Sequence, residues 1–238
     1  MEHGMRRRAA SLLTSAVLLT TLTVAAFAAP VAAANPVVNI VNGIPGMRVD
    51  ICIGGKETKS GLPYGGKVQR STLPGTKSLK VYKQDPRKCR GTLLAQRSLT
   101  VAADDDLTLV ATRFAPKFVT FDNTALGSTN YLAELSFRHA ADLGPVTMGW
   151  AIQSIQGLTP AAYTPFSKGD QFFFESANLT VRAIAQRAGK TFETSRWVDL
   201  PLISAVTDTF GNRHIEFILV GTNVKNARFV VIDRPPLS

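Results

Sequence analysis

The chain has 238 residues, of which 45% are hydrophobic and 18% are charged, and it contains two cysteines. This composition excludes a disordered chain and a small disulfide-dense fold, and the length allows one large domain or two domains of about 100 residues. The formal net charge of +10 favours anionic partners without saying which ones.

The first 34 residues have the tripartite pattern of a secretory signal peptide. Residues 6–8 are three arginines, residues 9–29 are uncharged and mostly apolar, and the three alanines at 32–34 fit a cleavage site. An uncleaved membrane anchor is the alternative, and the alanine-rich exit argues against it. We therefore predict a secreted protein, extracellular or in the cell envelope, with no transmembrane segment in the mature chain. Export also argues against a nucleic-acid partner.

After residue 34 the chain is patterned as short β-strands. Apolar and polar residues alternate with period two, which indicates a strand with one buried face. Turn-forming Gly, Pro, Asn and Asp separate these runs, and no long helical stripe occurs. The pattern predicts an all-β fold of immunoglobulin-like or related antiparallel β-sandwiches. The clearest runs are residues 47–53, 79–81, 107–111, 135–137 and 215–219.

The second half of the chain resembles the first half at both ends. With an offset of 97 residues, residues 38–51 align with residues 135–148 without a gap, and Asn42 falls on His139. Leu109–Thr112 and Phe118–Asp122 match Leu219–Thr222 and Phe229–Asp233, and residues 79–81 match residues 179–181. Two matched ends that bracket about 90 residues predict a duplication.

The predicted domain organisation follows from this repeat. Residues 1–34 are the cleaved signal peptide, residues 35–124 the first sandwich, residues 125–130 a polar linker, and residues 131–238 the second, divergent sandwich.

Several segments resemble the exported bacterial domain-of-unknown-function family 4397. Its members open with a strand, a V-H-G-x-P or V-H-A-x-P segment and then V-D-V-Y, and residues 38–51 are VNIVNGIPGMRVDI. Residues 62–68 and 73–81 resemble its next blocks, and residues 137–146 resemble the opening of a second copy. This chain departs from the family at Asn42, where His is frequent. The resemblance implies an exported β-sandwich in tandem copies, with no established activity.

Cys52 and Cys89 are the only cysteines, and an even pair in an exported protein predicts one disulfide. Two unpaired or buried thiols are the alternative. Two cysteines without a nearby histidine do not fill a metal's coordination shell, and residues 104–106 (Asp-Asp-Asp) fit a hairpin turn better than a calcium site. We expect neither a metal nor a cofactor.

No residue is marked by its context as a catalyst, so we predict that the protein is not an enzyme. His139 is expected to be a hydrogen-bonded turn residue. The alternative is an envelope hydrolase, and the stretch that holds His139, Asp142 and Glu134 would then be its candidate site. Because Glu134 and Arg138 share a strand face, a structural ion pair between them is an equal interpretation.

Positive charge is concentrated in the first half, where residues 48–97 hold 12 basic and 3 acidic side chains. A surface of one sign attracts anionic polymers in a salt-dependent way. We therefore predict a non-enzymatic binding or structural protein that contacts an anionic envelope polymer or lipid headgroups, and the alternative is a protein-binding module that uses sandwich loops or edges. The candidate anion-binding residues are Lys67, Arg70, Lys77, Lys80, Lys83, Arg87, Lys88 and Arg90.

Overall fold

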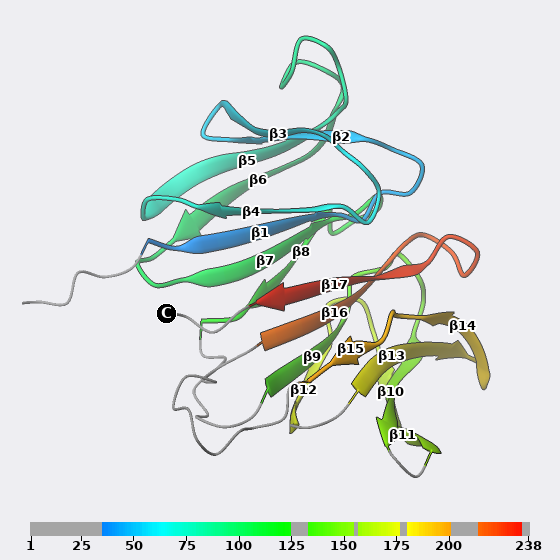
Figure 1. The fold of residues 1–238 in the computed structure, drawn as a ribbon. Coiled ribbons are helices and arrows are strands. Elements are labelled where there is room, and N and C mark those ends of the chain that lie inside the picture. Colours follow the sequence, from blue (N-terminus) through cyan, green and yellow to red (C-terminus); the bar gives the residue numbers. More distant parts are fainter. Residues whose placement is uncertain (1–34, 125–132, 155–156, 177–179, 201–213, 235–238) are drawn as a thin grey trace, which may run out of the picture. The chain divides into compact units, whose positions relative to one another are not determined.

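The computed structural model describes residues 35–124, 133–154, 157–176, 180–200 and 214–234 of the chain (Figure 1). Every regular element in these ranges is a β-strand, and they contain no helix long and apolar enough to cross a membrane. The predicted signal peptide, residues 1–34, and the predicted linker, residues 125–130, lie outside the described residues.

The first half forms two four-stranded sheets (Figure 1). One sheet has the order β4 (Lys67–Ser71), β1 (Val37–Asn42), β7 (Asp106–Ala111), β8 (Phe118–Asp122). The other has the order β3 (Lys56–Leu62), β2 (Val49–Ile53), β5 (Gly75–Lys83), β6 (Leu93–Val101).

The second half has the same strand order with later strands. One sheet has the order β12 (Gln171–Ser176), β9 (Ala133–His139), β16 (His214–Val220), β17 (Arg228–Arg234). The other has the order β11 (Gly157–Phe166), β10 (Val146–Ser154), β13 (Thr180–Arg187), β14 (Lys190–Thr194), and β15 (Val198–Asp199) pairs with β13. The predicted all-β sandwich fold is confirmed. Its sheets are antiparallel except at β1–β7 and β9–β16, which pair in parallel.

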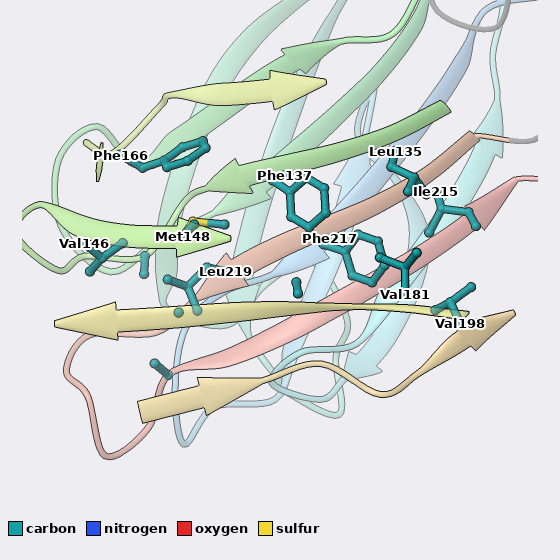
Figure 2. Packing of buried hydrophobic residues seen from close by; sticks show 14 of the residues in the cluster. Leu135, Phe137, Val146, Met148, Phe166, Val181, Val198, Ile215, Phe217 and Leu219 are labelled. Atoms are coloured by element: carbon teal, nitrogen blue, oxygen red, sulfur yellow. The ribbon is translucent and has the colours of Figure 1, made fainter. Parts of the chain in front are cut away.

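Each half has a core between its two sheets. The first core is mostly aliphatic, with Ile40, Ile51 and Leu109 fully buried. The second core contains stacked aromatic rings, which Figure 2 shows at Phe137 and Phe217. Their ring centroids lie 5.1 Å apart, and that of Trp150 lies 5.5 Å from Phe137. These are separations at which aromatic pairs add to the stabilisation from burial.

The strand pairings correct the predicted match between residues 79–81 and 179–181. Ile53 pairs with Leu79 in the first half, and Trp150, 97 positions after Ile53, pairs with Ala183 in the second. The counterpart of Leu79 is therefore Ala183, four residues beyond the predicted Leu179. The cause is the β10–β11 hairpin, which spans residues 146–166 where the β2–β3 hairpin spans 49–62.

A second correction concerns β7 and β16. Ile40 pairs with Leu109 and Phe137 pairs with Phe217, so Leu109 corresponds to Phe217 rather than to Leu219. The match between Phe118–Asp122 and Phe229–Asp233 agrees with the pairings, because both segments pair in the same way with the preceding strand. The two matches therefore differ in offset, because the connection between β16 and β17 is longer than that between β7 and β8.

Alternation predicted one buried face for β16, but all seven of its residues are buried. The second face is covered because the β1–β7–β8 and β9–β16–β17 layers share an apolar cluster between the halves, to which Val110, Phe121 and Ile218 belong. Thr108 donates a hydrogen bond to Glu216 across this contact, at 3.0 Å. A period-two pattern says which side chains share a face, but it does not say whether that face is solvated.

Candidate functional site

The predicted disulfide is present. Cys52 on β2 is bonded to Cys89 in the loop between β5 and β6. Lys88 makes an ion pair with Glu57 at 3.0 Å, and Arg87 makes one with Asp85 at 3.1 Å. The disulfide and the Lys88–Glu57 pair connect the basic loop to the sheet, whereas the Arg87–Asp85 pair lies within the loop. Acidic partners already balance the charges of Arg87 and Lys88.

Lys67 is directed to the second half of the chain. Its Nζ donates a hydrogen bond to the carbonyl oxygen of Val231 on β17, at 2.8 Å. Burial lowers the pKa of Lys67, and the positive charge of Arg196 lowers it further. Lys67 therefore contributes to the contact between the halves, although the residue itself is exposed.

Arg70 and Lys77 come together in a hollow at the open edge of the first sandwich, where the edge strands β3 and β4 lie next to each other. The hollow has a volume of about 360 Å³. Arg70 bridges the two sheets, because its Nη2 donates a hydrogen bond to the carbonyl oxygen of Thr58 on β3 at 2.8 Å. We call this hollow the basic pocket. Its lining residues are Ile53, Gly54, Lys56, Thr58, Arg70, Ser71, Thr72 and Lys77.

The lining of the basic pocket has the chemistry of an anion site. It contains three cations, Lys56, Arg70 and Lys77, and three hydroxyl side chains, but no carboxylate. Glu57, the neighbour of Lys56, has its carboxylate in the ion pair with Lys88. Guanidinium, ammonium and hydroxyl groups are the side-chain donors that bind phosphate, sulfate and carboxylate oxygens. No acidic lining group competes for these donors, although the Lys77 Nζ already donates to the carbonyl oxygens of Leu73 and Pro74, at 2.5 and 3.5 Å.

The other predicted cations do not line this pocket. Lys80 lies on β5 between the buried Leu79 and Val81, on the opposite face, as its alternation predicted. Lys83 is exposed at the end of β5, and Arg90 is exposed in the disulfide-bonded loop. Of the eight candidates, Arg70 and Lys77 line one pocket, and Arg87, Lys88 and Arg90 lie together in the disulfide-bonded loop.

Four polar lining residues were missed by sequence reasoning: Lys56, Thr58, Ser71 and Thr72. The signal for the first two was weak but present, since Lys56 and Thr58 are two apart just after the Gly54-Gly55 turn. The proximity of β3 and β4, which belong to different sheets, had no local signature.

His139 is a turn residue, as predicted. Its side chain is buried, its Nδ1 accepts a hydrogen bond from the backbone N–H of Ala141 at 3.2 Å, and its Nε2 lies 3.5 Å from the carbonyl oxygen of Gly144. Burial lowers its pKa and keeps the ring neutral. Asp142 accepts hydrogen bonds from the backbone N–H groups of Arg113 and Phe114, at 2.9 and 3.0 Å. Both side chains therefore make hydrogen bonds with backbone groups.

Buried charges lie between the halves. Arg138 makes an ion pair with Glu216, and Arg234 bridges Glu216 and Asp106, with Arg234 Nε 2.8 Å from the Glu216 carboxylate. Arg138 thus pairs with Glu216, and Glu134, the partner that the sequence suggested, also attracts its charge. Burial raises the pKa of Glu216, against the effect of the neighbouring Arg138, and burial lowers the pKa of Arg234 to about 10.

We define these four groups as the buried ion network. It contains two positive and two negative side chains, so its charges balance internally. Its role is structural: the four groups pair with one another across the contact between the halves. Among the described residues, no group of three or more His, Cys, Asp or Glu is placed to hold a metal ion.

Comparison with known proteins gives one family. Residues 36–148 match the sequence model of the family described as domain of unknown function (DUF4397). This single match covers the first sandwich and continues through β9 to the start of β10. No curated protein matches the chain.

Two solved structures resemble the chain at low similarity. One is CBMbc, a family CBM26 module of Eubacterium rectale Amy13K in complex with maltoheptaose, with 11% identity over 84% of this chain and 98% of that one, at a TM-score of 0.24. The other is a Bacteroides uniformis protein provisionally named a cell adhesion protein, with 9% identity over 80% of this chain and 91% of that one, at a TM-score of 0.23. Similarities of this size do not inform what the present chain binds.

Proposed function

We propose that this protein is an exported, non-enzymatic binding protein of the cell envelope, and that its basic pocket binds an anionic envelope component, either a polymer or lipid headgroups. The observation that carries the proposal is the lining of that pocket: three cations and three hydroxyls without a carboxylate. Export is supported by the tripartite pattern of residues 1–34 and by the Cys52–Cys89 disulfide, a bond that persists in oxidising compartments.

We also propose that residues 131–238 are a diverged second copy of the domain formed by residues 35–124. The repeated strand order supports this, as does the correspondence of Asn42 with His139. In this proposal the second copy supports the first copy through the contact between the halves.

The test is binding of the purified, oxidised protein to washed envelope from the source cell across a salt series. We expect saturable binding that weakens as salt rises, because exposed charges are screened. In the variant Lys56→Gln/Arg70→Gln/Lys77→Gln, affinity should fall at least about tenfold, since three charged donors are lost. The matched control is Lys59→Gln/Lys83→Gln/Arg90→Gln, which removes the same charge from exposed sites outside the pocket.

The outcomes separate the possible sites. A loss confined to the pocket variant supports the proposal. Equal loss in both variants would move the binding to a dispersed basic surface. Absence of binding at low salt would contradict an anionic envelope ligand, and binding unaffected by either variant would favour the protein-binding alternative that uses sandwich loops or edges.

A further inference from the structure

A second hollow lies at the other end of the first sandwich. Its volume is about 300 Å³, and its apolar walls are Ile44, Met47, Leu94 and Phe114. Ile44 and Met47 precede β2, whereas the basic pocket adjoins the residues that end β2, so the length of a strand separates the two hollows. We call the second hollow the apolar pocket.

The wall formed by Phe114 is held in place by the second half of the chain. Asp142 accepts hydrogen bonds from the backbone N–H groups of Arg113 and Phe114. Lys168, which is paired with Asp142, places its Nζ 3.2–3.4 Å from the carbonyl oxygens of Phe114, Ala115 and Pro116. Both side chains of this clamp are mostly buried, at 3% exposed for Asp142 and 14% for Lys168.

The clamp, formed by Asp142 and Lys168, explains how the exposed side chain of Phe114 keeps its position beside the hollow. The Phe114 side chain belongs to a residue that is 56% exposed, and a loop with so little core contact would otherwise let the ring collapse onto the surface. Because both its N–H and its C=O are bound from the second half, the loop backbone has a defined position. An apolar wall that the fold holds in place fits a small-molecule site, because such sites are largely formed before the ligand binds.

The charges at the apolar pocket give the chemistry of its occupant. Arg113 and Lys117 line it and no carboxylate does. The guanidinium of Arg113 lies 5.8 Å from the centroid of the Phe114 ring, so positive charge stands directly beside the apolar wall. A ligand that satisfies both features has an apolar body and one negative end. The volume is at the lower limit of small-molecule sites, which suits a small molecule rather than a polymer segment.

We propose that the apolar pocket binds a medium-chain alkyl carboxylate, with the chain against Ile44, Met47, Leu94 and Phe114 and the carboxylate beside Arg113 and Lys117. Asp142 is a positioning residue for this site, because it acts through the backbone of the loop and does not line the hollow. The site is independent of the basic pocket, so either can fail without the other.

The experiment uses protein labelled with carbon-13 at the methionine methyl groups and titrated with octanoate. Met47 lines the pocket, whereas Met148 is buried in the core of the second half and serves as an internal control. We expect a saturable shift of the Met47 signal with no shift of Met148. Two control ligands carry one feature each: octanol has the alkyl chain without the charge, and inorganic phosphate has charge without the chain. The affinity of each, read from the Met47 signal, should be at least about tenfold lower than that of octanoate.

Three variants test the assignment. Arg113→Gln/Lys117→Gln should weaken octanoate at least about tenfold, and the matched control Lys56→Gln/Lys77→Gln should leave it unchanged. The variant Asp142→Asn removes the carboxylate that pairs with Lys168. It should lower the affinity for octanoate, while envelope binding through the basic pocket stays the same. A general loss of structure would weaken both octanoate binding and envelope binding. A loss of octanoate binding alone therefore indicates that Asp142 positions the loop.

The proposal is overturned by any of three results. The first is no saturable shift of Met47, and the second is equal shifts from octanol and octanoate. The third is an unchanged affinity in Arg113→Gln/Lys117→Gln.

Discussion

The first sandwich holds the turn after β1 with Asn42, and the second holds the equivalent turn with His139. Asn42 accepts a hydrogen bond from the N–H of Ile44, two residues on, and donates one to the carbonyl of Met47, five residues on. His139 faces the same two groups, at Ala141 and Gly144. The position requires one acceptor and one donor, which an amide and a neutral imidazole both supply. The two halves thus share a backbone requirement and meet it with different chemistry.

The same contrast holds for the means of stabilisation. The first sandwich has an aliphatic core and a disulfide, whereas the second has stacked aromatic rings and no cysteine. The buried ion network joins them with groups from both, Asp106 from the first and Glu216 from the second. The same strand order is therefore compatible with cores of different composition, provided that one face of each sheet is buried.

Removing one member of the network should give the largest effect. Glu216→Gln leaves Arg138 and Arg234 without their shared buried counter-charge, and we expect a loss of about 3–5 kcal/mol in the free energy of unfolding. Urea denaturation followed by circular dichroism would measure it. In Arg138→Met/Glu216→Leu much of the loss should be recovered, and a double variant as unstable as the sum of the single ones would contradict the pairing.

Removing the disulfide, which lies in the first sandwich, should have the second largest effect on stability. Cys52→Ser/Cys89→Ser should lower the free energy of unfolding by about 3–4 kcal/mol, because the closed loop of 37 residues no longer restricts the unfolded chain. Both tryptophans, Trp150 and Trp197, lie in the second half. Their fluorescence should therefore change after circular dichroism does in the variant, and a simultaneous change would show that the halves unfold as one.

Acid should destabilise the protein through the second half. Burial lowers the pKa of His214 to about 3, so the unfolded state takes up the proton near pH 6.5 while the folded state stays neutral. Stability is therefore present above about pH 6.5 and is lost as pH falls toward 3. Between pH 6.5 and 4 the loss is about 3 kcal/mol. His214→Gln should flatten this part of the curve, and an equally steep curve in the variant would assign the effect elsewhere.

The exchange of turn residues should have the smallest effect. His139→Asn is expected to change the free energy of unfolding by less than about 1 kcal/mol, because the amide can make both hydrogen bonds. His139→Ala leaves a buried N–H without its acceptor and should cost about 1–3 kcal/mol. Thermal melts at neutral pH would compare the two, and equal losses would refute the equivalence with Asn42.

Local features of the sequence predicted local features of the structure. Lys80 faces away from Leu79 and Val81, as alternation requires, and Asp105 accepts a hydrogen bond from the N–H of Ala102 in the predicted turn. The basic pocket was anticipated only in part. Arg70 and Lys77 were among the candidates, but Lys56 was not, since its proximity depends on an edge where two sheets meet.

The sequence by itself determined the all-β fold, the pairing of its two cysteines and the role of His139 as a turn residue. The fold follows from the period-two alternation, the disulfide from the even number of cysteines, and the role of His139 from residues a few positions away. Only the tertiary structure decided that the second faces of β7 and β16 are buried, that Leu79 corresponds to Ala183, and which cations share a pocket. The physical reason is that a side chain's face is set by the backbone it belongs to, whereas what covers that face is set by strands far away in the chain.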